Sequence, residues 1–303
     1  MLGIDLSDEL SKSYELYGVD RVPPGLSARR AGGKGRGSRV KEFFDCDIAD
    51  AQKILEIITR IKPDIVVHTA AMTDVDDCET GKDKAYKINA AGAANVAKAC
   101  GKTGSVLIYI STDFVFDGKK KEPYGESDKP NPLGVYGDSK LKGERAVAKC
   151  LKNYFILRTS WLYGANGKNF VDTIIARAKT EEALKVVDDQ VGSPTYTKDL
   201  AKAIHALLDK ISFQLSAFSF QLYGTYHVSN SGSVSWFEYA REILRLAGSG
   251  AKVIPISSGE LNRPARRPAM SVLDNSKFVK FTGYKMRNWK DALKDYIFEG
   301  KGR

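Results

Sequence analysis

Short apolar segments alternate with amphipathic segments through the first half of the chain, and this alternation constrains the fold more than any other feature. Residues 65–67 and 106–110 carry apolar side chains on both faces of an extended chain. Strands of that kind must be covered by helices on both sides of their sheet. Connections of a dozen or more residues between such strands are typical of parallel pairing with right-handed crossovers. We therefore predict an α/β fold with a doubly wound parallel sheet.

The alternation continues in the order strand, helix, strand, helix as far as residue 157. We expect strands at 14–19, 65–67, 106–110 and 154–157, and helices at 54–61, 85–100 and 141–151. After residue 160 the pattern loosens, although 199–208 indicates one more helix and 224–229 one more strand. Prolines and polar loops among these later elements predict a smaller C-terminal lobe beside the strand ends, where open α/β sheets bind their ligands.

Composition excludes several classes of protein. The 303 residues carry 47 Lys and Arg against 37 Asp and Glu, and this basic excess fits a phosphate-bearing ligand. The basic clusters at 29–41 and 263–267 lack the interleaved aromatic residues of a nucleic-acid surface, so we expect no nucleic-acid partner. Four scattered cysteines and three scattered histidines predict reduced thiols and no metal site.

The chain also lacks the patterns of export and membrane insertion. Its first ten residues are acidic where a signal peptide is basic, and no apolar stretch approaches 18 residues. We therefore expect a cytoplasmic protein with no membrane partner. Residues 25–38, which are rich in Gly, Ser and Arg, are expected to form a mobile surface loop.

One tyrosine and one lysine carry the chemistry that the sequence suggests. Tyr136 and Lys140 are four residues apart, which places both side chains on one face of a helix. A phenol is a poor acid at neutral pH, and an adjacent ammonium stabilises the phenolate. Tyr136 would donate a proton to a carbonyl oxygen while hydride reaches its carbon, and Thr112, at the end of a strand, would hydrogen-bond the same oxygen. The alternative is an exposed Tyr and a solvated Lys on an ordinary helix.

Seven segments, spread in order over nearly the whole chain, carry a recognisable pattern: 68–79 (HTAAMTDVDDCE), 88–95 (INAAGAAN), 110–118 (ISTDFVFDG), 132–140 (PLGVYGDSK), 158–164 (RTSWLYG), 187–195 (VDDQVGSPT) and 267–274 (RPAMSVLD). In sequence and in order, these segments resemble the extended short-chain dehydrogenase/reductase family, and within it the TDP-4-dehydrorhamnose reductases. Related epimerases and dehydratases share several of these segments, but the segment around Trp161 and the loop 190–195 resemble the reductases. A dehydratase would typically show an Asp-Glu pair after Thr112, whereas here Asp113 is followed by Phe114.

The resemblance implies a Rossmann-type fold and reduction of the 4-keto group of TDP-4-dehydrorhamnose to TDP-L-rhamnose, in nucleotide-sugar and cell-surface polysaccharide biosynthesis. It implies NADPH or NADH as cofactor, a nucleotide-sugar substrate and a homodimer as one option for assembly. It also implies that residues 1–160 and 196–229 form a dinucleotide-binding core, and that 161–195 and 230–303 form a substrate-binding lobe.

The resemblance further implies which residues line each ligand. The residues implied for the cofactor are Gly3, Asp20, Arg21, Asp47, Ile48, Ala70, Ala71, Thr73, Tyr136 and Lys140, and those for the substrate are Val75, Asp113, Phe114, Trp161 and Arg267. An arginine suits a diphosphate through its bidentate fork, and a tryptophan gives a flat wall for a deoxysugar. Simpler roles stay open, because Ala70 and Ala71 could merely permit close packing and Trp161 could be a core residue.

Asp20 and Arg21 bear on the choice of cofactor. An acid at the end of the second strand usually accepts the ribose 2′-hydroxyl of NAD, and an arginine beside it could meet the 2′-phosphate of NADP. We therefore expect that both cofactors can be used. The alternative is that this Asp-Arg pair belongs to a surface turn.

The start of the chain departs from the family's pattern. A dinucleotide-binding fold opens with an apolar strand and a Gly-x-x-Gly-x-x-Gly turn, whereas this sequence begins Met1-Leu-Gly3. Gly3 resembles the third glycine and residues 4–11 the helix after it, so we expect the first strand and two glycines to be missing. The strands at 14–19 and 65–67 would then lack their shared neighbour.

Two interpretations of this start compete. In one, the protein is an intact enzyme and the start of this sequence is an artefact. We favour this interpretation because the other segments are complete. In the other the chain has lost cofactor binding and is a non-catalytic regulatory or scaffold subunit, similar to the β subunit of methionine adenosyltransferase. Another nucleotide-sugar reductase or epimerase is a further alternative.

Overall fold

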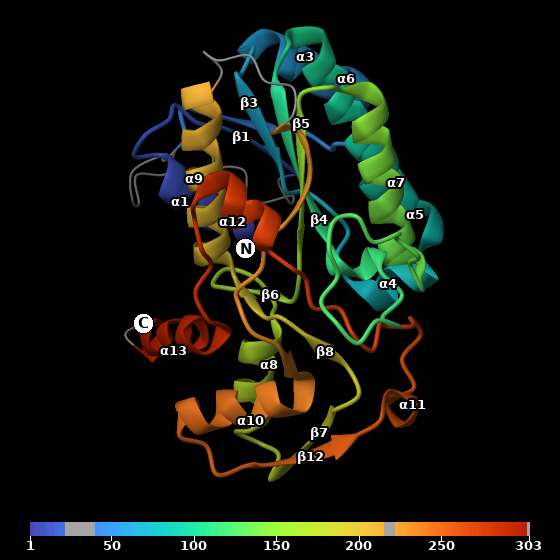
Figure 1. Cartoon of the computed structure of the whole chain (residues 1–303), viewed down its shortest axis with the longest axis vertical. Helices are drawn as coiled ribbons and strands as arrows, with labels where there is room; N and C mark the ends of the chain where they lie inside the picture. The colour runs from blue at the N-terminus through green and yellow to red at the C-terminus, as the bar shows by residue number, and fades with distance from the viewer. Residues whose placement is uncertain (22–39, 215–221, 302–303) are drawn as a thin grey trace.

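The computed structural model describes residues 1–21, 40–214 and 222–301, and its centre is a four-stranded parallel sheet (Figure 1). The strand order is β10-β5-β4-β3, built from β3 (Ile65–His68), β4 (Val106–Thr112), β5 (Tyr154–Thr159) and β10 (Gly224–His227). One face is covered by α3 (Ala51–Ile61), α6 (Ala93–Thr103) and α7 (Val135–Cys150), and the other by α1 (Leu2–Leu10), α9 (Thr197–Gln214) and α12 (Ser276–Thr282). The predicted doubly wound parallel sheet is confirmed. The expected loop at 25–38 lies outside the described residues.

Strand β4 shows why the sheet must be covered on both faces. All seven of its residues are buried, and successive side chains point to opposite sides. Val106, Ile108 and Ile110 pack into the core against α1 and α9. Leu107 and Tyr109 pack into the other core, against α3 and α6. The apolar run therefore joins two hydrophobic cores through one strand.

A second, two-stranded parallel sheet lies on the β3 side of the molecule. It consists of β1 (Tyr17–Asp20) and β2 (Glu42–Asp45). Within the described part of the chain, β1 and β3 belong to separate sheets and no strand pairs with both. Strand β2 is not predicted by the sequence, because two phenylalanines between acidic residues give only a short apolar signal.

The C-terminal lobe lies below the central sheet in Figure 1. Its elements are β6 (Leu162–Tyr163), α8 (Phe170–Arg177), β7 (Ala183–Val187), β8 (Val191–Gly192), β9 (Thr195–Tyr196), β11 (Val234–Ser235), α10 (Trp236–Ala247), β12 (Lys252–Ile256), α11 (Ser258–Leu261) and α13 (Trp289–Lys301). Tyr163, Tyr196, Tyr239 and Trp289 are buried together in its core. Helix α12 instead packs on the central sheet through Phe278, so the residue boundaries of the two predicted domains stay a prediction.

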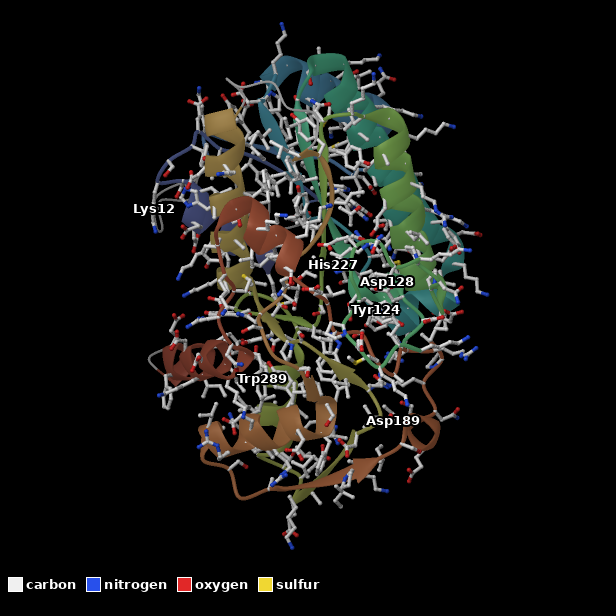
Figure 2. All side chains as sticks on the ribbon, viewed as in Figure 1. Lys12, Tyr124, Asp128, Asp189, His227 and Trp289 are labelled. Atoms are coloured by element: carbon white, nitrogen blue, oxygen red, sulfur yellow. The ribbon has the colours of Figure 1, made fainter. Side chains whose placement is uncertain are left out.

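A buried histidine fixes the loop around Tyr124 to the end of the central sheet. His227, at the end of β10, lies close to Tyr124 and Asp128 (Figure 2). Its Nδ1 atom is 2.9 Å from the carbonyl oxygen of Tyr124, and its backbone N–H donates to Glu126. Burial lowers the pKa of His227 to about 3. The loop that carries Tyr124 is thus fixed by a histidine that stays neutral at physiological pH.

The described cysteines are all free thiols, as the sequence predicts. In the part of the chain that the structure describes, no helix combines the length and the apolar character needed to cross a membrane.

Candidate active site

The carboxyl ends of β1, β3, β4 and β5 open into one pocket of about 1490 Å³. It extends from the N-terminus of α1, past α7, to α8 and α10 of the lobe. A site for a single drug-sized ligand occupies about 300–1,000 Å³. The pocket therefore has room for two extended ligands, and it lies where doubly wound sheets bind them.

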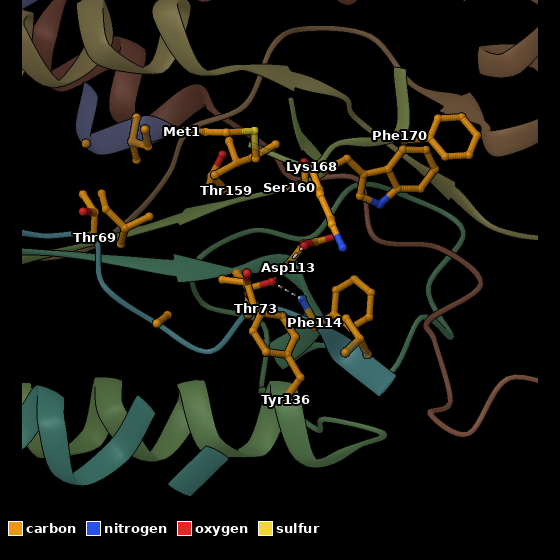
Figure 3. Close-up of a pocket in the computed structure, with 18 of the residues that line it drawn as sticks. Met1, Thr69, Thr73, Asp113, Phe114, Tyr136, Thr159, Ser160, Lys168 and Phe170 are labelled. Carbon is orange, nitrogen blue, oxygen red and sulfur yellow. Dashed lines mark hydrogen bonds between the residues drawn. The ribbon is translucent and has the colours of Figure 1, made fainter. Parts of the chain in front are cut away.

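Tyr136 enters this pocket from the first turn of α7 (Figure 3). Its ring meets that of Phe114 edge-on, with 5.6 Å between the ring centroids. The next residue, Gly137, faces the backbone of Phe114 so closely that a Cβ atom would lie 2.9 Å from the carbonyl carbon. Glycine at this position lets α7 approach the short 3-10 turn η2 (Asp113–Val115), which directly follows Thr112. The sequence-predicted Tyr136 and Thr112 are thereby brought together.

The protonation states of Tyr136 and Lys140 follow from their burial. Burial raises the pKa of Tyr136, and a hydrogen bond with Thr112 offsets part of the effect. Lys140 is 3% exposed, and its ammonium donates to the carbonyl oxygen of Ile110 at 2.7 Å and lies 4.1 Å from the centre of the Tyr109 ring. Burial lowers the pKa of Lys140 to about 7, against the opposing effect of Glu144. The site thus holds a protonated phenol beside a lysine that titrates near neutrality.

Asp113 is a second group whose charge depends on burial. It lies at the start of η2 and its Oδ1 accepts a hydrogen bond from Thr112 at 3.1 Å. Burial raises the pKa of Asp113 to about 7, and hydrogen bonds from Ser271 and Thr112 only partly oppose this. A carboxyl group of this kind can donate as well as accept a hydrogen bond near neutral pH.

A buried asparagine holds the loop after β3 against α7. Asn89 lies on a π-helical turn, η1 (Lys87–Gly92), between α5 (Lys82–Tyr86) and α6. Its amide exchanges hydrogen bonds with the backbone of Met72 at 2.8 and 3.0 Å, and donates to Ser139 at 3.0 Å. This clamp places Ala70, Ala71 and Thr73 in the pocket wall. Sequence reasoning includes Asn89 in a matching segment but gives it no role.

Only some of the residues predicted for the cofactor line the pocket. Gly3 and Asp20 line the pocket, at α1 and at the end of β1. Arg21, Asp47 and Ile48 are outside the described lining. Arg21 lies 3.6 Å from the carboxylate of Asp47, and Ile48 packs closely on Gly92. A role for these last three residues stays a prediction.

All five residues predicted for the substrate, Val75, Asp113, Phe114, Trp161 and Arg267, line the pocket. Arg267 and Arg263 each place a guanidinium nitrogen 3.0 Å from the same carboxylate oxygen of Asp76, on α4 (Val75–Thr80). The shared acid holds both cations at the pocket. Sequence reasoning assigns a ligand role only to Arg267.

Trp161 forms an aromatic wall with a residue that the sequence does not predict. Its backbone has a φ of +46°, and its ring stacks on that of Trp236 with 3.5 Å between centroids and 6° between planes. A Cβ atom at Gly192 would lie 2.6 Å from Cζ2 of the Trp161 ring and closer still to Cε2, so a glycine is needed there. Phe170 packs on Trp236, and Lys168 extends into the pocket from the side opposite Tyr136 (Figure 3). Since α8 and α10 bring these residues in from distant segments, no spacing in the sequence indicates them.

The site therefore combines a proton donor, a neighbouring lysine, a buried carboxyl group, cations and an aromatic wall. Among residues 1–21, 40–214 and 222–301, no group of three or more His, Cys, Asp or Glu side chains is placed to hold a metal ion. The arrangement fits proton transfer to a carbonyl oxygen of an anionic, sugar-sized ligand.

Comparison with known proteins gives consistent matches over most of the chain. The sequence model of the family described as RmlD substrate binding domain matches residues 1–301. The chain is 38% identical over 263 residues to a dTDP-4-dehydrorhamnose reductase of Sinorhizobium fredii, covering 84% of this chain and 88% of that protein. It is 42% identical over 253 residues to the spore coat polysaccharide biosynthesis protein SpsK of Bacillus subtilis, covering 84% and 85%.

Solved structures agree with these sequence matches. The crystal structure of dTDP-4-dehydrorhamnose reductase from Bacillus anthracis in complex with NADP is 38% identical, with a TM-score of 0.81, and covers 94% of this chain and 100% of that one. A dTDP-4-dehydrorhamnose reductase structure from Clostridium acetobutylicum is 39% identical, also with a TM-score of 0.81, and covers 95% and 100%.

Proposed function

The chain belongs to the RmlD substrate binding domain family, and from this premise we propose that it reduces TDP-4-dehydrorhamnose to TDP-L-rhamnose with NADPH or NADH. The observation that carries the proposal is the grouping of Thr112, Tyr136 and Lys140 at the carboxyl end of a parallel sheet, inside a pocket large enough for two ligands. The product is a precursor for cell-surface polysaccharide, which agrees with the name of the Bacillus subtilis relative.

Tyr136 is proposed as the proton donor. Because burial raises its pKa, the phenol is protonated over the physiological range and can donate to the 4-keto oxygen as this oxygen gains negative charge. The hydroxyl of Thr112, which donates to Asp113 in this structure, would turn to donate a hydrogen bond to the same oxygen. The ammonium of Lys140 stabilises the phenolate that forms. The phenolate then regains its proton from solvent. NADPH, when bound, supplies the hydride for the carbonyl carbon.

The described residues fit such a dinucleotide. The pocket wall is continuous from Gly3, at the N-terminal end of α1, past Asp20, at the end of β1, to Ala70, Ala71 and Lys140. A helix N-terminus attracts a diphosphate, and an acid at a strand end accepts ribose hydroxyls. We assign these residues to the cofactor.

The lobe side of the pocket is assigned to the sugar nucleotide. Trp161 offers a flat surface to the deoxysugar, and Arg267 offers a cation to the diphosphate. We assign Asp113 to a sugar hydroxyl, and we assign Val75 and Phe114, which line the same pocket, to the substrate as well. The division into a cofactor core and a substrate lobe, action in the cytoplasm, and assembly as a homodimer belong to the same proposal. Free cysteines fit a reducing compartment.

One observation favours a second candidate, a non-catalytic scaffold. Within the described residues β1 and β3 share no strand, so the sheet is interrupted beside the proposed cofactor site. A scaffold would bind a partner protein and would not turn over the sugar nucleotide.

Turnover distinguishes the two candidates. The purified chain is mixed with TDP-4-dehydrorhamnose and NADPH, loss of NADPH absorbance is followed, and the product is identified by NMR. Formation of TDP-L-rhamnose supports the reductase. A folded chain that leaves the substrate unchanged and that captures a stable protein partner in a pull-down supports the scaffold.

A further inference from the structure

A buried acid lies one helical turn beyond Lys140. Glu144 is four residues further along α7, so its side chain shares the helix face of Tyr136 and Lys140. Glu144 is 4% exposed, and so is Arg158 on β5, which binds it. Burying a carboxylate costs free energy unless the charge is paired. The position of this buried acid beside the proposed active site therefore needs an explanation.

The carboxylate of Glu144 is fixed from two strands. Arg158 donates to it through both prongs of its fork, Nε to Oε1 at 2.9 Å and Nη2 to Oε2 at 2.7 Å. Ser111 on β4 donates to Oε1 at 2.6 Å. Because Ser111 directly precedes Thr112, the network ties the helix that carries Lys140 to the strand that carries Thr112.

Arg158 has little other polar function. Its remaining nitrogen, Nη1, has no hydrogen-bond partner among the described residues, and its guanidinium lies 5.1 Å from the centre of the Phe116 ring. The guanidinium thus serves mainly to hold Glu144 in one orientation.

Lys140 needs a compensating charge where it lies. Its ammonium carries three N–H donors, and the contacts to the Ile110 carbonyl and the Tyr109 ring include no carboxylate. Burial favours the neutral amine and lowers the pKa of Lys140 to about 7, while the negative charge of Glu144 acts in the opposite direction.

The other titratable groups around Lys140 and Glu144 do not replace this charge. They are His68 on β3, Tyr109 on β4, Asp113 on η2, Tyr154 and Arg158 on β5, and Tyr136 on α7. His68 is buried and its pKa is lowered to about 3, so it is neutral at working pH. The negative charge of Asp113 raises the pKa of Tyr136, and burial raises the pKa of Asp113 itself to about 7.

We propose that Glu144 is a positioning residue for the reaction, held by Arg158 and Ser111 so that its charge keeps the buried Lys140 side chain in the ammonium form beside Tyr136. Glu144 acts through Lys140 and touches neither ligand. The inference rests on the proposed reductase function, in which a charged Lys140 stabilises the phenolate of Tyr136.

The test measures the titration of Lys140 directly. Lysine side chains are labelled with ¹³C at Cε, the Lys140 signal is identified by its loss in Lys140→Met, and its pKa is read by NMR in wild type and in Glu144→Gln. Glutamine keeps hydrogen-bond acceptance but removes the charge. Loss of a nearby opposite charge typically lowers the pKa of a lysine by about 1 unit or more, and we expect a fall of this size for Lys140. Because the reaction needs the ammonium form of Lys140, kcat/KM of wild type should fall as the pH rises through about 7. In Glu144→Gln this fall should move to lower pH by the same amount as the pKa.

Two further variants separate this role from a structural one. Asp138→Asn removes a partly exposed acid of the same helix that pairs with Lys142 at 3.0 Å, and it should leave the Lys140 titration unchanged. The double variant Glu144→Gln/Arg158→Gln removes both buried charges, and its Lys140 pKa should lie between those of wild type and Glu144→Gln. If Glu144→Gln does not fold, the double variant decides.

The proposal is overturned if Lys140 titrates at the wild-type pH in folded Glu144→Gln, or in the double variant where the single one is unfolded. The NMR titration needs no substrate. If no form of the chain reduces the sugar nucleotide while the Lys140 pKa still falls in Glu144→Gln, the proposed function fails and the charge relation between Glu144 and Lys140 stands.

Discussion

Gly137 sets the separation between the helix that carries Tyr136 and the turn that follows Thr112. A Cβ atom at this position would lie 2.9 Å from the carbonyl carbon of Phe114 and closer still to its oxygen. These are backbone atoms and cannot rotate away. In Gly137→Ala, α7 and the turn must therefore separate by about 1 Å, a backbone adjustment that typically costs about 1–3 kcal/mol.

This displacement should reduce catalysis more than binding. A misplacement of about 1 Å between reacting groups can cost about 10²-fold in rate, so we expect kcat to fall about 100-fold with a smaller change in the KM for NADPH. Alanine favours a helix over glycine by about 1 kcal/mol, so a drop in the free energy of unfolding would report the clash itself.

The assay is steady-state turnover of TDP-4-dehydrorhamnose together with thermal unfolding. Gly250→Ala is the matched control, because nothing lies within 4 Å of a Cβ atom there. A Gly137→Ala variant with wild-type kcat and wild-type or higher stability would refute the reasoning, since the close approach of α7 to the turn would then not position Tyr136.

Four further predictions follow from the same geometry. Tyr136→Phe should lower kcat by about 10²–10⁴ with an unchanged Kd for NADPH, whereas Tyr86→Phe, outside the pocket lining, should keep its rate; comparable rates in both would remove Tyr136 from the mechanism. Lys140→Met should weaken NADPH binding and move the titration of the essential tyrosine to higher pH, and a pH profile and a cofactor titration that both match wild type would count against it. His227 has a pKa of about 3 in the folded protein, so only the unfolded chain takes up a proton at this side chain as the pH falls from about 6.5 toward 3. The free energy of unfolding of wild type should therefore fall by up to about 1.4 kcal/mol per pH unit over this range, and chemical denaturation of His227→Asn should show a shallower pH dependence. An apolar strand that ends in Gly-x-x-Gly, joined ahead of Met1, should pair with the edges of β1 and β3 and tighten NADPH binding. Equal affinity by calorimetry with and without the strand would contradict this.

The sheet could be predicted because its inner strands must be apolar on both faces. Strand β4 shows this most clearly, since all of its residues are buried between two helical layers. Tyr136 and Lys140 could be predicted for a related reason, because a spacing of four residues fixes their relation within one helix. In both cases a local rule determines where the side chains point.

Features formed by distant segments could not be predicted in this way. The stacking of Trp161 on Trp236 depends on how α10 packs in the lobe, and the pairing of Arg158 with Glu144 depends on how β5 lies under α7. The clamp of Asn89 on the loop after β3 depends on a π-helical turn that has no spacing rule. Such contacts are properties of the tertiary structure.

Hydride transfer to the sugar carbon tests the central claim most directly. The chain is incubated with TDP-4-dehydrorhamnose and NADPH that carries deuterium at the transferred position, and the product is examined by NMR. Our account predicts TDP-L-rhamnose with one deuterium at C4 of the sugar. Unchanged TDP-4-dehydrorhamnose after incubation with folded protein, or a product without deuterium at C4, would contradict it.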